Sequence, residues 1–236
     1  MPSPTCAMLI TRPEPGASTW EQHFRQYTDV LVFKAPLLTI EPVVLTEHPD
    51  MPDALLITSP NAIPYAAQFI GVPVYAVGEQ SAETARSAGL KVAGTGPGFA
   101  GEELFTAVPR GTDLLHLSGK HLAKDLAAGF AERGVQYRRA VVYEAIKRRD
   151  VPRSLIEFLG ASLPKFATFV SSRTVEAFAA LAQSQQCDEP AGGITAICAS
   201  ERIAATARTT YPFKETVVTG STEAARFVDF ATARRT

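Results

Sequence analysis

Short apolar runs alternate along the chain with small polar turns and amphipathic segments. The run Leu55–Ile57 ends at Thr58, and apolar residues at helical spacing follow Pro60. Short runs rich in aliphatic residues are typical of buried strands. Ser59 or Asn61 is expected to cap the following helix, since serine and asparagine are preferred N-cap residues. Pro60 lies where a proline is tolerated in a first helical turn. Hydroxyl groups beside the amides of a helix N-terminus suit an anion.

The same order of strand, small polar turn and helix recurs along the rest of the chain. A chain that alternates strands and helices in this way builds parallel sheets with helices on their faces. The pattern therefore predicts an α/β protein whose strand ends carry polar turns. Further strands are expected at residues 6–10, 30–33, 74–77, 114–117, 166–170, 194–197 and 216–218.

Two extended segments interrupt this alternation. Residues 36–42 and 137–146 alternate apolar and polar side chains, and prolines bound the first of them. They bracket one block of strand–helix units, which predicts an inserted domain over 37–146 and a discontinuous domain made of 1–36 and 147–236. The two connectors are expected to pair as an antiparallel ribbon that forms a hinge. A cleft between the domains would then be the default ligand site.

Composition and charge narrow the possible partners. The 236 residues suffice for two domains, and the net charge of −1 lacks the basic surplus of a general nucleic-acid binder. Residues 120–153 nevertheless carry nine basic and four acidic side chains. Two interpretations of this surplus stay open: a solvated helix face with a charged loop, or a rim that attracts an acidic small molecule.

The sequence lacks the signals of several other kinds of site and of secretion or membrane insertion. The three cysteines are far apart, and neither they nor the four histidines show a metal-ligand spacing, so no metal site or disulfide framework is expected. His116 lies in an apolar strand and is expected to pack there. The glycine-rich segment 94–98 is expected to be a loop and lacks the pattern of a phosphate-binding motif. No signal peptide or membrane span is found, so we expect a cytoplasmic protein without a membrane partner.

Seven segments, in order, resemble the uroporphyrinogen-III synthase family of tetrapyrrole synthesis. They span nearly the whole chain, and their order is more specific than any one of them. The segments are LITRPEPGA (Leu9–Ala17), ITSPNAI (Ile57–Ile63), YAVGEQSAETARSAG (Tyr75–Gly89), LLHLSGK (Leu114–Lys120), VVYEA (Val141–Ala145), FVSSRTVEAF (Phe169–Phe178) and ICASERIAATA (Ile197–Ala207).

The resemblance implies a fold and a reaction. The fold is two flavodoxin-like α/β domains, one of them discontinuous, joined by a two-stranded β ribbon. The reaction is that of a lyase: the linear tetrapyrrole hydroxymethylbilane loses water and closes with ring D inverted, giving uroporphyrinogen III in the interdomain cleft. The resemblance implies no metal or organic cofactor. It implies a monomer with a small-molecule substrate, and a transient handover from hydroxymethylbilane synthase is a further expectation.

The resemblance also implies site residues. Tyr143 matches a tyrosine that the family carries on its second connector, and it is either a weak general acid or a residue that buttresses the hinge. The predicted substrate-binding residues follow strand ends, where serines also cap helices and cations can simply be exposed. They are Thr11, Arg12, Ser59, Asn61, Gly78, Ser81, Ser118, Gly119, Lys120, Ser171, Ser172, Arg173 and Ser200.

Two rival functions remain open at this stage. A two-domain hinge protein without a catalytic constellation could be a non-catalytic sensor of a small polycarboxylate, although no DNA-binding segment is evident. Another α/β enzyme, such as a sugar-nucleotide transferase, would need a metal-binding acidic pair near a strand end, and the sequence offers none.

Overall fold

The chain folds into two compact units. A computed structural model describes residues 3–45, 49–96, 102–184 and 193–233. The first unit comprises Met1–Thr39 and Ile146–Thr236, and the second comprises Ile40–Ala145. The first unit is therefore discontinuous in sequence, with the second inserted into it.

The first unit is built on a five-stranded parallel sheet in the order β11-β10-β9-β1-β2. Every residue of β1 and of β10 is buried, as expected for inner strands covered on both faces. Numbered within this unit, the order is 2-1-3-4-5, which is that of flavodoxin. The strands are β1 (Cys6–Ile10), β2 (Val30–Lys34), β9 (Lys165–Phe169), β10 (Ile194–Cys198) and β11 (Glu215–Val218).

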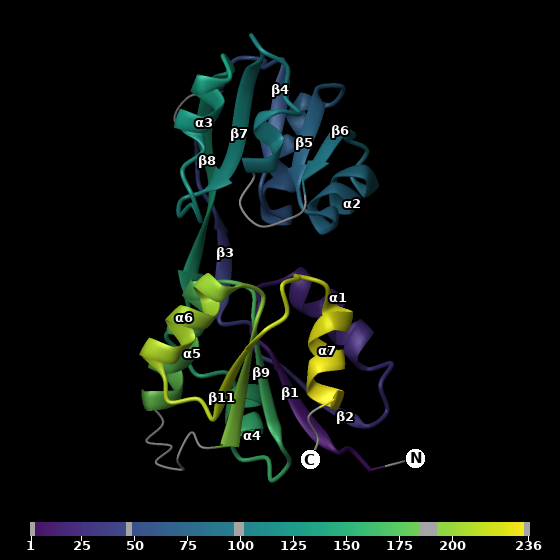
Figure 1. Cartoon of the computed structure of the whole chain (residues 1–236), viewed down its shortest axis with the longest axis vertical. Helices are drawn as coiled ribbons and strands as arrows, with labels where there is room; N and C mark the ends of the chain where they lie inside the picture. The colour runs from purple at the N-terminus through teal and green to yellow at the C-terminus, as the bar shows by residue number, and fades with distance from the viewer. Residues whose placement is uncertain (1–2, 46–48, 97–101, 185–192, 234–236) are drawn as a thin grey trace. The chain divides into compact units, whose positions relative to one another are not determined.

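Among the described residues of this unit, five helices cover the sheet (Figure 1). Helices α1 and α7 contact each other, and Trp20 and Phe227 join them with ring centroids 4.7 Å apart. Helices α5 and α6 form a second contacting pair, and α4 packs on β1 and β2. The helices are α1 (Gly16–Phe24), α4 (Arg153–Leu159), α5 (Ser172–Ser184), α6 (Glu201–Thr210) and α7 (Ala224–Ala233).

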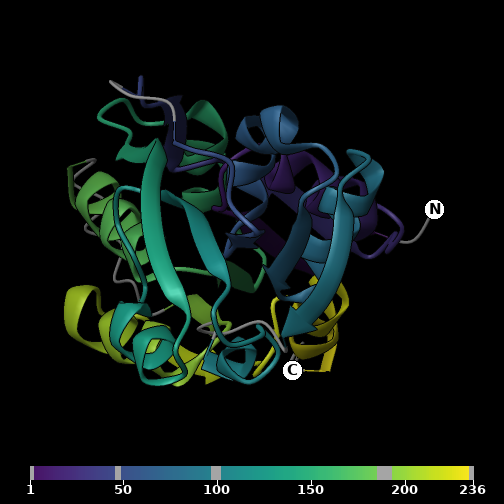
Figure 2. The same cartoon turned by 90° about the horizontal axis from the view of Figure 1, so that it is seen from above.

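The second unit is built on a sheet in the order β3-β8-β7-β4-β5-β6, whose strands are labelled in Figure 1. Figure 2 shows the same structure from above. Its five parallel strands run 3-2-1-4-5 when numbered within the unit, an order that differs from that of the first unit. Two separate core clusters cover the faces of the sheet. The elements are β3 (Leu38–Pro42), β4 (Ala54–Ile57), η1 (Pro60–Phe69), β5 (Pro73–Val77), α2 (Glu79–Ser87), β6 (Lys91–Gly96), η2 (Glu102–Phe105), β7 (Asp113–Gly119), α3 (Ala127–Glu132) and β8 (Gln136–Lys147).

The helix after β4 is a 3₁₀-helix. Ser59 caps it as predicted, since its side chain accepts a hydrogen bond from the Asn61 backbone N–H at 3.3 Å. Pro64 lies inside the helix and has no N–H to donate, so a regular α-helical ladder cannot form there. Ala62, Ile63 and other apolar residues of this helix are nevertheless buried in one of the two core clusters.

The prediction of a loop from residue 94 was wrong for its first three positions. Gly94 and Gly96 belong to β6, which pairs with β5. A Cβ at Gly94 would approach the ring of Tyr75 to 2.9 Å, so the missing side chain makes room for the tyrosine. Residues 97 and 98 of the predicted loop lie outside the described residues.

A two-stranded ribbon carries both crossings between the units. The division falls after Thr39 in β3 and after Ala145 in β8. Val43 N–H donates to Val142 O at 3.0 Å, and Arg148 N–H donates to Leu37 O at 3.1 Å. Residue numbers rise along one strand as they fall along the other, so the two strands are antiparallel, and the predicted ribbon is present.

The helices that the structure describes include none long and apolar enough to cross a membrane.

Candidate functional site

The polar turns of the second unit gather where its strand order reverses. Strand β4 is flanked by β5 and β7, and the chain winds outward from it in both directions. In open α/β sheets, ligands bind outside the carboxyl ends of the strands at such a point. Ser59 and Asn61 follow β4, whereas Gly119 ends β7 and Lys120 comes next. We call this region, together with Tyr143 on β8, the second-unit tip.

A β-bulge turns Tyr143 toward this tip. Ser118 pairs with Val141, but Gly119 pairs with Tyr143, so Val142 is an extra residue in β8. Without the bulge, alternation would direct Tyr143 to the same face as Tyr137. Instead, Val142 and Tyr143 both pack with one core cluster and Tyr137 packs with the other. The bulge therefore decides which face of the sheet receives the Tyr143 phenol.

Gly119 leaves the space that the Tyr143 ring occupies. A Cβ at this position would lie 2.7 Å from two ring carbons and 2.9 Å from the phenol oxygen. Any larger residue would therefore displace the ring. Gly119, predicted as a substrate-binding residue, is thus brought into direct contact with Tyr143.

The phenol of Tyr143 also interacts with the turn after β4. Burial raises its pKa, while hydrogen bonds from the side chains of Ser59 and Asn61 act in the opposite direction. Ser59 Oγ already accepts from the Asn61 backbone, so its own O–H is available to donate to the phenol oxygen. Three predicted residues from two segments of the chain, the turn after β4 and strand β8, therefore lie close together.

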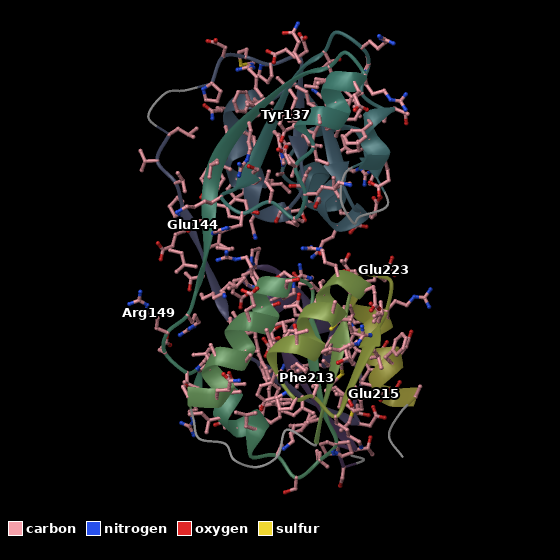
Figure 3. All side chains as sticks on the ribbon, turned by 60° about the vertical axis from the view of Figure 1, so that its left-hand side comes forward. Tyr137, Glu144, Arg149, Phe213, Glu215 and Glu223 are labelled. Carbon is pink, nitrogen blue, oxygen red and sulfur yellow. The ribbon has the colours of Figure 1, made fainter. Side chains whose placement is uncertain are left out.

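The turn after β7 is held by Arg139, a residue that the sequence analysis did not select. Its Nε donates to Ser118 Oγ at 2.8 Å, and its Nη2 donates to Gly119 O at 2.7 Å and to Lys120 O at 2.9 Å. Lys120 Nζ lies 3.0 Å from a carboxylate oxygen of Glu144, labelled in Figure 3. Both partners of that ion pair are partly exposed, so a substrate carboxylate could replace Glu144 at little cost.

Gly78 and Ser81 lie farther along the sheet. They belong to the turn and first helical residues after β5, a strand that is separated from β7 by β4. Gly78 has a φ of 81°, a conformation that glycine adopts readily. The Ser81 N–H donates to Gly78 O, and the Ser81 side chain is buried. The structure gives these two residues a clear role in starting α2.

In the first unit, the hydroxyl groups of several predicted substrate-binding residues form hydrogen bonds within the unit itself. Thr11 is buried and donates to Thr168 O at 2.5 Å, and Thr168 donates to Leu9 O at 2.8 Å. Ser171 Oγ accepts from the Thr174 N–H at 3.2 Å and so caps α5. These bonds connect β1 with β9 and start a helix. They also occupy the proton of Thr11 and a lone pair of Ser171.

Other predicted residues of the first unit lie at neighbouring strand ends. The Arg12 guanidinium lies 4.8 Å from the centroid of the Trp20 ring, and burial lowers its pKa to about 10. The sequence allows Arg12 to be either a substrate-binding residue or a freely exposed cation, and its burial argues against the second interpretation. Ser172 Oγ accepts a hydrogen bond from Thr206 at 3.0 Å, and Ser200 is the N-cap residue of α6. Arg173 is a partly buried residue in the first turn of α5.

From the sequence, His116 is expected only to pack in an apolar strand. His116 is fully buried, as predicted, but its ring connects the hydroxyl groups of Thr58 and Tyr137. Burial, and secondarily Arg139, lower its pKa to about 4. The sequence signal is a histidine in an otherwise aliphatic strand, but one of its partners directly follows β4 and the other lies in β8. The described residues contain no group of three or more His, Cys, Asp or Glu side chains that could hold a metal ion.

Comparisons with known proteins agree with this architecture. The family model described as uroporphyrinogen-III synthase HemD matches residues 18–227. The structure is similar to uroporphyrinogen-III synthetase from Helicobacter pylori, with a TM-score of 0.65 and 20% identity over 96% of this chain and 98% of that one. It is also similar to a mutant uroporphyrinogen III synthase from Thermus thermophilus, with a TM-score of 0.54 and 16% identity over 97% of each chain. A search of curated proteins gives no significant match.

The family match covers most of the chain, and the two solved structures share its fold over nearly their whole length. The chain therefore belongs to the uroporphyrinogen-III synthase (HemD) family of porphyrin and heme biosynthesis, whose substrate is a small tetrapyrrole.

Proposed function

We propose that this chain is a lyase that converts hydroxymethylbilane into uroporphyrinogen III, with loss of water and inversion of ring D. The observation that carries the proposal is the environment of Tyr143 at the second-unit tip. Its phenol lies beside Gly119 and interacts with the side chains of Ser59 and Asn61. Each of these residues belongs to a segment that resembles the family.

The environment of Tyr143 suits a weak general acid. Burial raises the pKa of the phenol, so it stays protonated at neutral pH. The Ser59 hydroxyl and the Asn61 amide can donate to its oxygen, an arrangement that leaves the phenolic proton for a substrate and stabilises the charge that forms when the proton moves. A group with these properties can assist the departure of a hydroxyl group.

The proposed reaction balances without a second reactant. Tyr143 donates its proton to the hydroxymethyl oxygen as the C–O bond breaks, and the oxygen leaves as water. The electron-poor carbon that remains is attacked by the α-carbon of ring D that already bonds to the carbon linking it to ring C, which forms a new C–C bond. The older bond between ring D and that linking carbon then breaks, and the linking carbon bonds to the free α-carbon of ring D, which inverts the ring. The pyrrole system then gives up one proton, and this proton restores the phenol. Holding the two ends together is the larger part of the task, because closure of a long chain depends on proximity.

Backbone amides and cations at the strand ends would bind the carboxylates of the substrate. The 3₁₀-helix after β4 and helices α2, α5 and α6 each begin at a predicted serine or glycine turn. Helix N-termini favour anions through their unpaired N–H groups. Lys120, Arg12 and Arg173 add positive charge near strand ends, and carboxylates bind well to such groups.

An isomer assay tests the proposal. Hydroxymethylbilane would be generated in place, and the porphyrin isomers would be separated by chromatography after oxidation. We expect the type III isomer to dominate over the type I isomer that forms spontaneously. A folded protein that yields only type I would contradict the enzymatic function and favour a non-catalytic sensor of a polycarboxylate.

A further inference from the structure

A row of three polar side chains crosses one face of the second sheet. Thr58 follows β4, His116 lies in β7 and Tyr137 lies in β8. His116 Nε2 is 3.0 Å from Thr58 Oγ1, and His116 Nδ1 is 2.7 Å from the Tyr137 hydroxyl oxygen. The two outer members lie on opposite sides of the imidazole, so the protonation of one ring nitrogen determines the role of the other.

Tyr137 is the hydrogen-bond donor at one end of this row. In the part of the chain that the structure describes, His116 is the one hydrogen-bond partner of the Tyr137 hydroxyl. Burial raises the pKa of Tyr137 to about 12, so the phenol keeps its proton. Its ring stacks on Phe130 with an interplanar angle of 10°, which holds the hydroxyl in place. The Tyr137 side chain is partly buried, and the acceptor within reach of its hydroxyl proton is His116 Nδ1.

His116 then becomes a donor toward Thr58. The ring is neutral at physiological pH, since burial lowers its pKa to about 4. A neutral imidazole carries one proton, and with Nδ1 accepting from Tyr137 that proton lies on Nε2. The Nε2–Thr58 distance of 3.0 Å is the usual length of an N–H···O hydrogen bond. Thr58 Oγ1 therefore accepts from His116, and its own O–H remains to be donated elsewhere.

Thr58 is well placed to use that proton. It is partly exposed, it precedes Ser59, and it lies at the carboxyl end of β4, where the strand order reverses. We propose that His116 and Tyr137 are positioning residues that fix Thr58 as a hydrogen-bond donor to a carboxylate of the substrate. The identity of that carboxylate rests on the proposed function, whereas the direction of the hydrogen bonds does not. If Thr58 instead donated its proton to His116 Nε2, its hydroxyl oxygen would offer only lone pairs to the substrate and would repel a carboxylate.

The tautomer of His116 tests the direction of the row. Nitrogen NMR of the ligand-free protein, labelled with ¹⁵N in its histidine rings, distinguishes the two neutral forms. The spectrum of His116→Gln identifies the signal of His116 among the four histidines. We expect the form protonated on Nε2 and not on Nδ1 at pH 7. The Nδ1-protonated form, or a charged ring, would overturn the proposal whatever the protein catalyses.

Kinetics test the role of Thr58. Thr58→Val keeps the shape and removes the hydroxyl, so we expect KM to rise about tenfold with kcat changed less than about threefold, because a hydrogen bond to a charged group is lost. Thr58→Ser should restore most of the affinity. Tyr137→Phe should raise KM about threefold, because His116 is no longer held in one tautomer. Tyr75→Phe is the matched control, since Tyr75 is a buried tyrosine of the same core cluster.

The outcomes separate this inference from the proposed function. A wild-type protein that forms no type III isomer would contradict the proposed function, and the NMR result would still decide the direction of the row. An active wild type in which Thr58→Val and Tyr137→Phe leave KM unchanged would overturn the positioning role alone. Thermal unfolding of each variant confirms that the measured change belongs to a folded protein.

Discussion

The strand ends of the two units carry similar small polar residues but use them differently. In the first unit, Thr11 donates to a backbone carbonyl of the neighbouring strand and Ser171 caps a helix. In the second unit, Ser59 and Asn61 approach the phenol of Tyr143. The first arrangement mainly completes the hydrogen bonds of the fold, whereas the second surrounds a group that can exchange a proton.

This difference has an identifiable structural origin. The first unit keeps regular register between β1 and β9, so its alternation is undisturbed. The second unit has a bulge opposite Gly119, and this bulge redirects Tyr143. The two α/β sheets thus present similar polar turns, and one extra residue in a strand brings a tyrosine to the turns of one of them. The comparison predicts that substitutions at the strand ends of the second unit lower kcat, whereas substitutions at the strand ends of either unit weaken substrate binding.

Filling the space at Gly119 should give the largest effect on the second unit. Gly119→Ala places a Cβ 2.7 Å from the Tyr143 ring, so the phenol must move away from Ser59 and Asn61. We expect kcat to fall about 100-fold, the typical contribution of a positioned general acid. Steady-state turnover measures this.

Gly160→Ala is the matched control for this prediction. The added Cβ there would have its nearest neighbour at an ordinary distance of 3.6 Å. Its turnover should equal that of the wild type. A Gly119→Ala variant with wild-type kcat would show that the position of the Tyr143 ring does not matter for turnover.

Acid should destabilise the protein through His116. Above pH 6.5 the ring is mostly neutral in both the folded and unfolded states. Between pH 6.5 and about 4, the unfolded chain takes up a proton that the folded chain does not, since burial lowers the pKa to about 4. The free energy of unfolding therefore falls with the pH, and His116 accounts for about 3 kcal/mol of this loss by about pH 4.

Urea unfolding at a series of pH values measures the effect of His116. The curve of stability against pH should be flatter for His116→Gln than for the wild type over this range. The carboxylates that titrate there are common to both proteins, so the difference isolates the imidazole. Parallel curves would show that His116 titrates normally in the folded protein.

The smallest expected effects distinguish the serines of the two units. Ser171→Ala removes a helix cap and should lower the free energy of unfolding by about 1 kcal/mol. Because Ser171 is a predicted substrate-binding residue, its loss should raise KM. The kcat value should change little, because the Ser171 hydroxyl bonds to Thr174 within its own unit and not to Tyr143. Ser59→Ala should instead lower kcat several-fold, because a hydrogen bond to the phenol is lost. Equal kcat values for the two variants would remove the distinction between the units.

Local patterns in the sequence predict much of this fold. The short aliphatic runs correspond to strands, because buried parallel strands need continuous apolar surface. The alternation of the two connectors, together with the prolines that bound the first, predicts the ribbon of β3 and β8. Ser59 is visible as a helix cap next to a first-turn proline. All these signals lie within a few residues of the element that they predict.

Features that depend on distant neighbours could not be found in this way. The bulge at Val142 leaves the apolar pattern of β8 intact, and it is visible only against β7. The row from Thr58 through His116 to Tyr137 requires the order and register of three strands. The assignment of Gly94 to a strand depends on the Tyr75 ring opposite it. In each case the deciding contact comes from another strand of the sheet.

The most direct test of the central claim is the turnover of Tyr143→Phe, measured beside Tyr65→Phe. Tyr65 packs against the same core cluster, and burial raises the pKa of both phenols, so the control matches the loss of a partly buried hydroxyl. We predict that Tyr143→Phe lowers kcat for the type III isomer about 100-fold while Tyr65→Phe leaves it unchanged. Near-wild-type turnover of a folded Tyr143→Phe variant would contradict the acid role of Tyr143 and place the chemistry of this chain elsewhere.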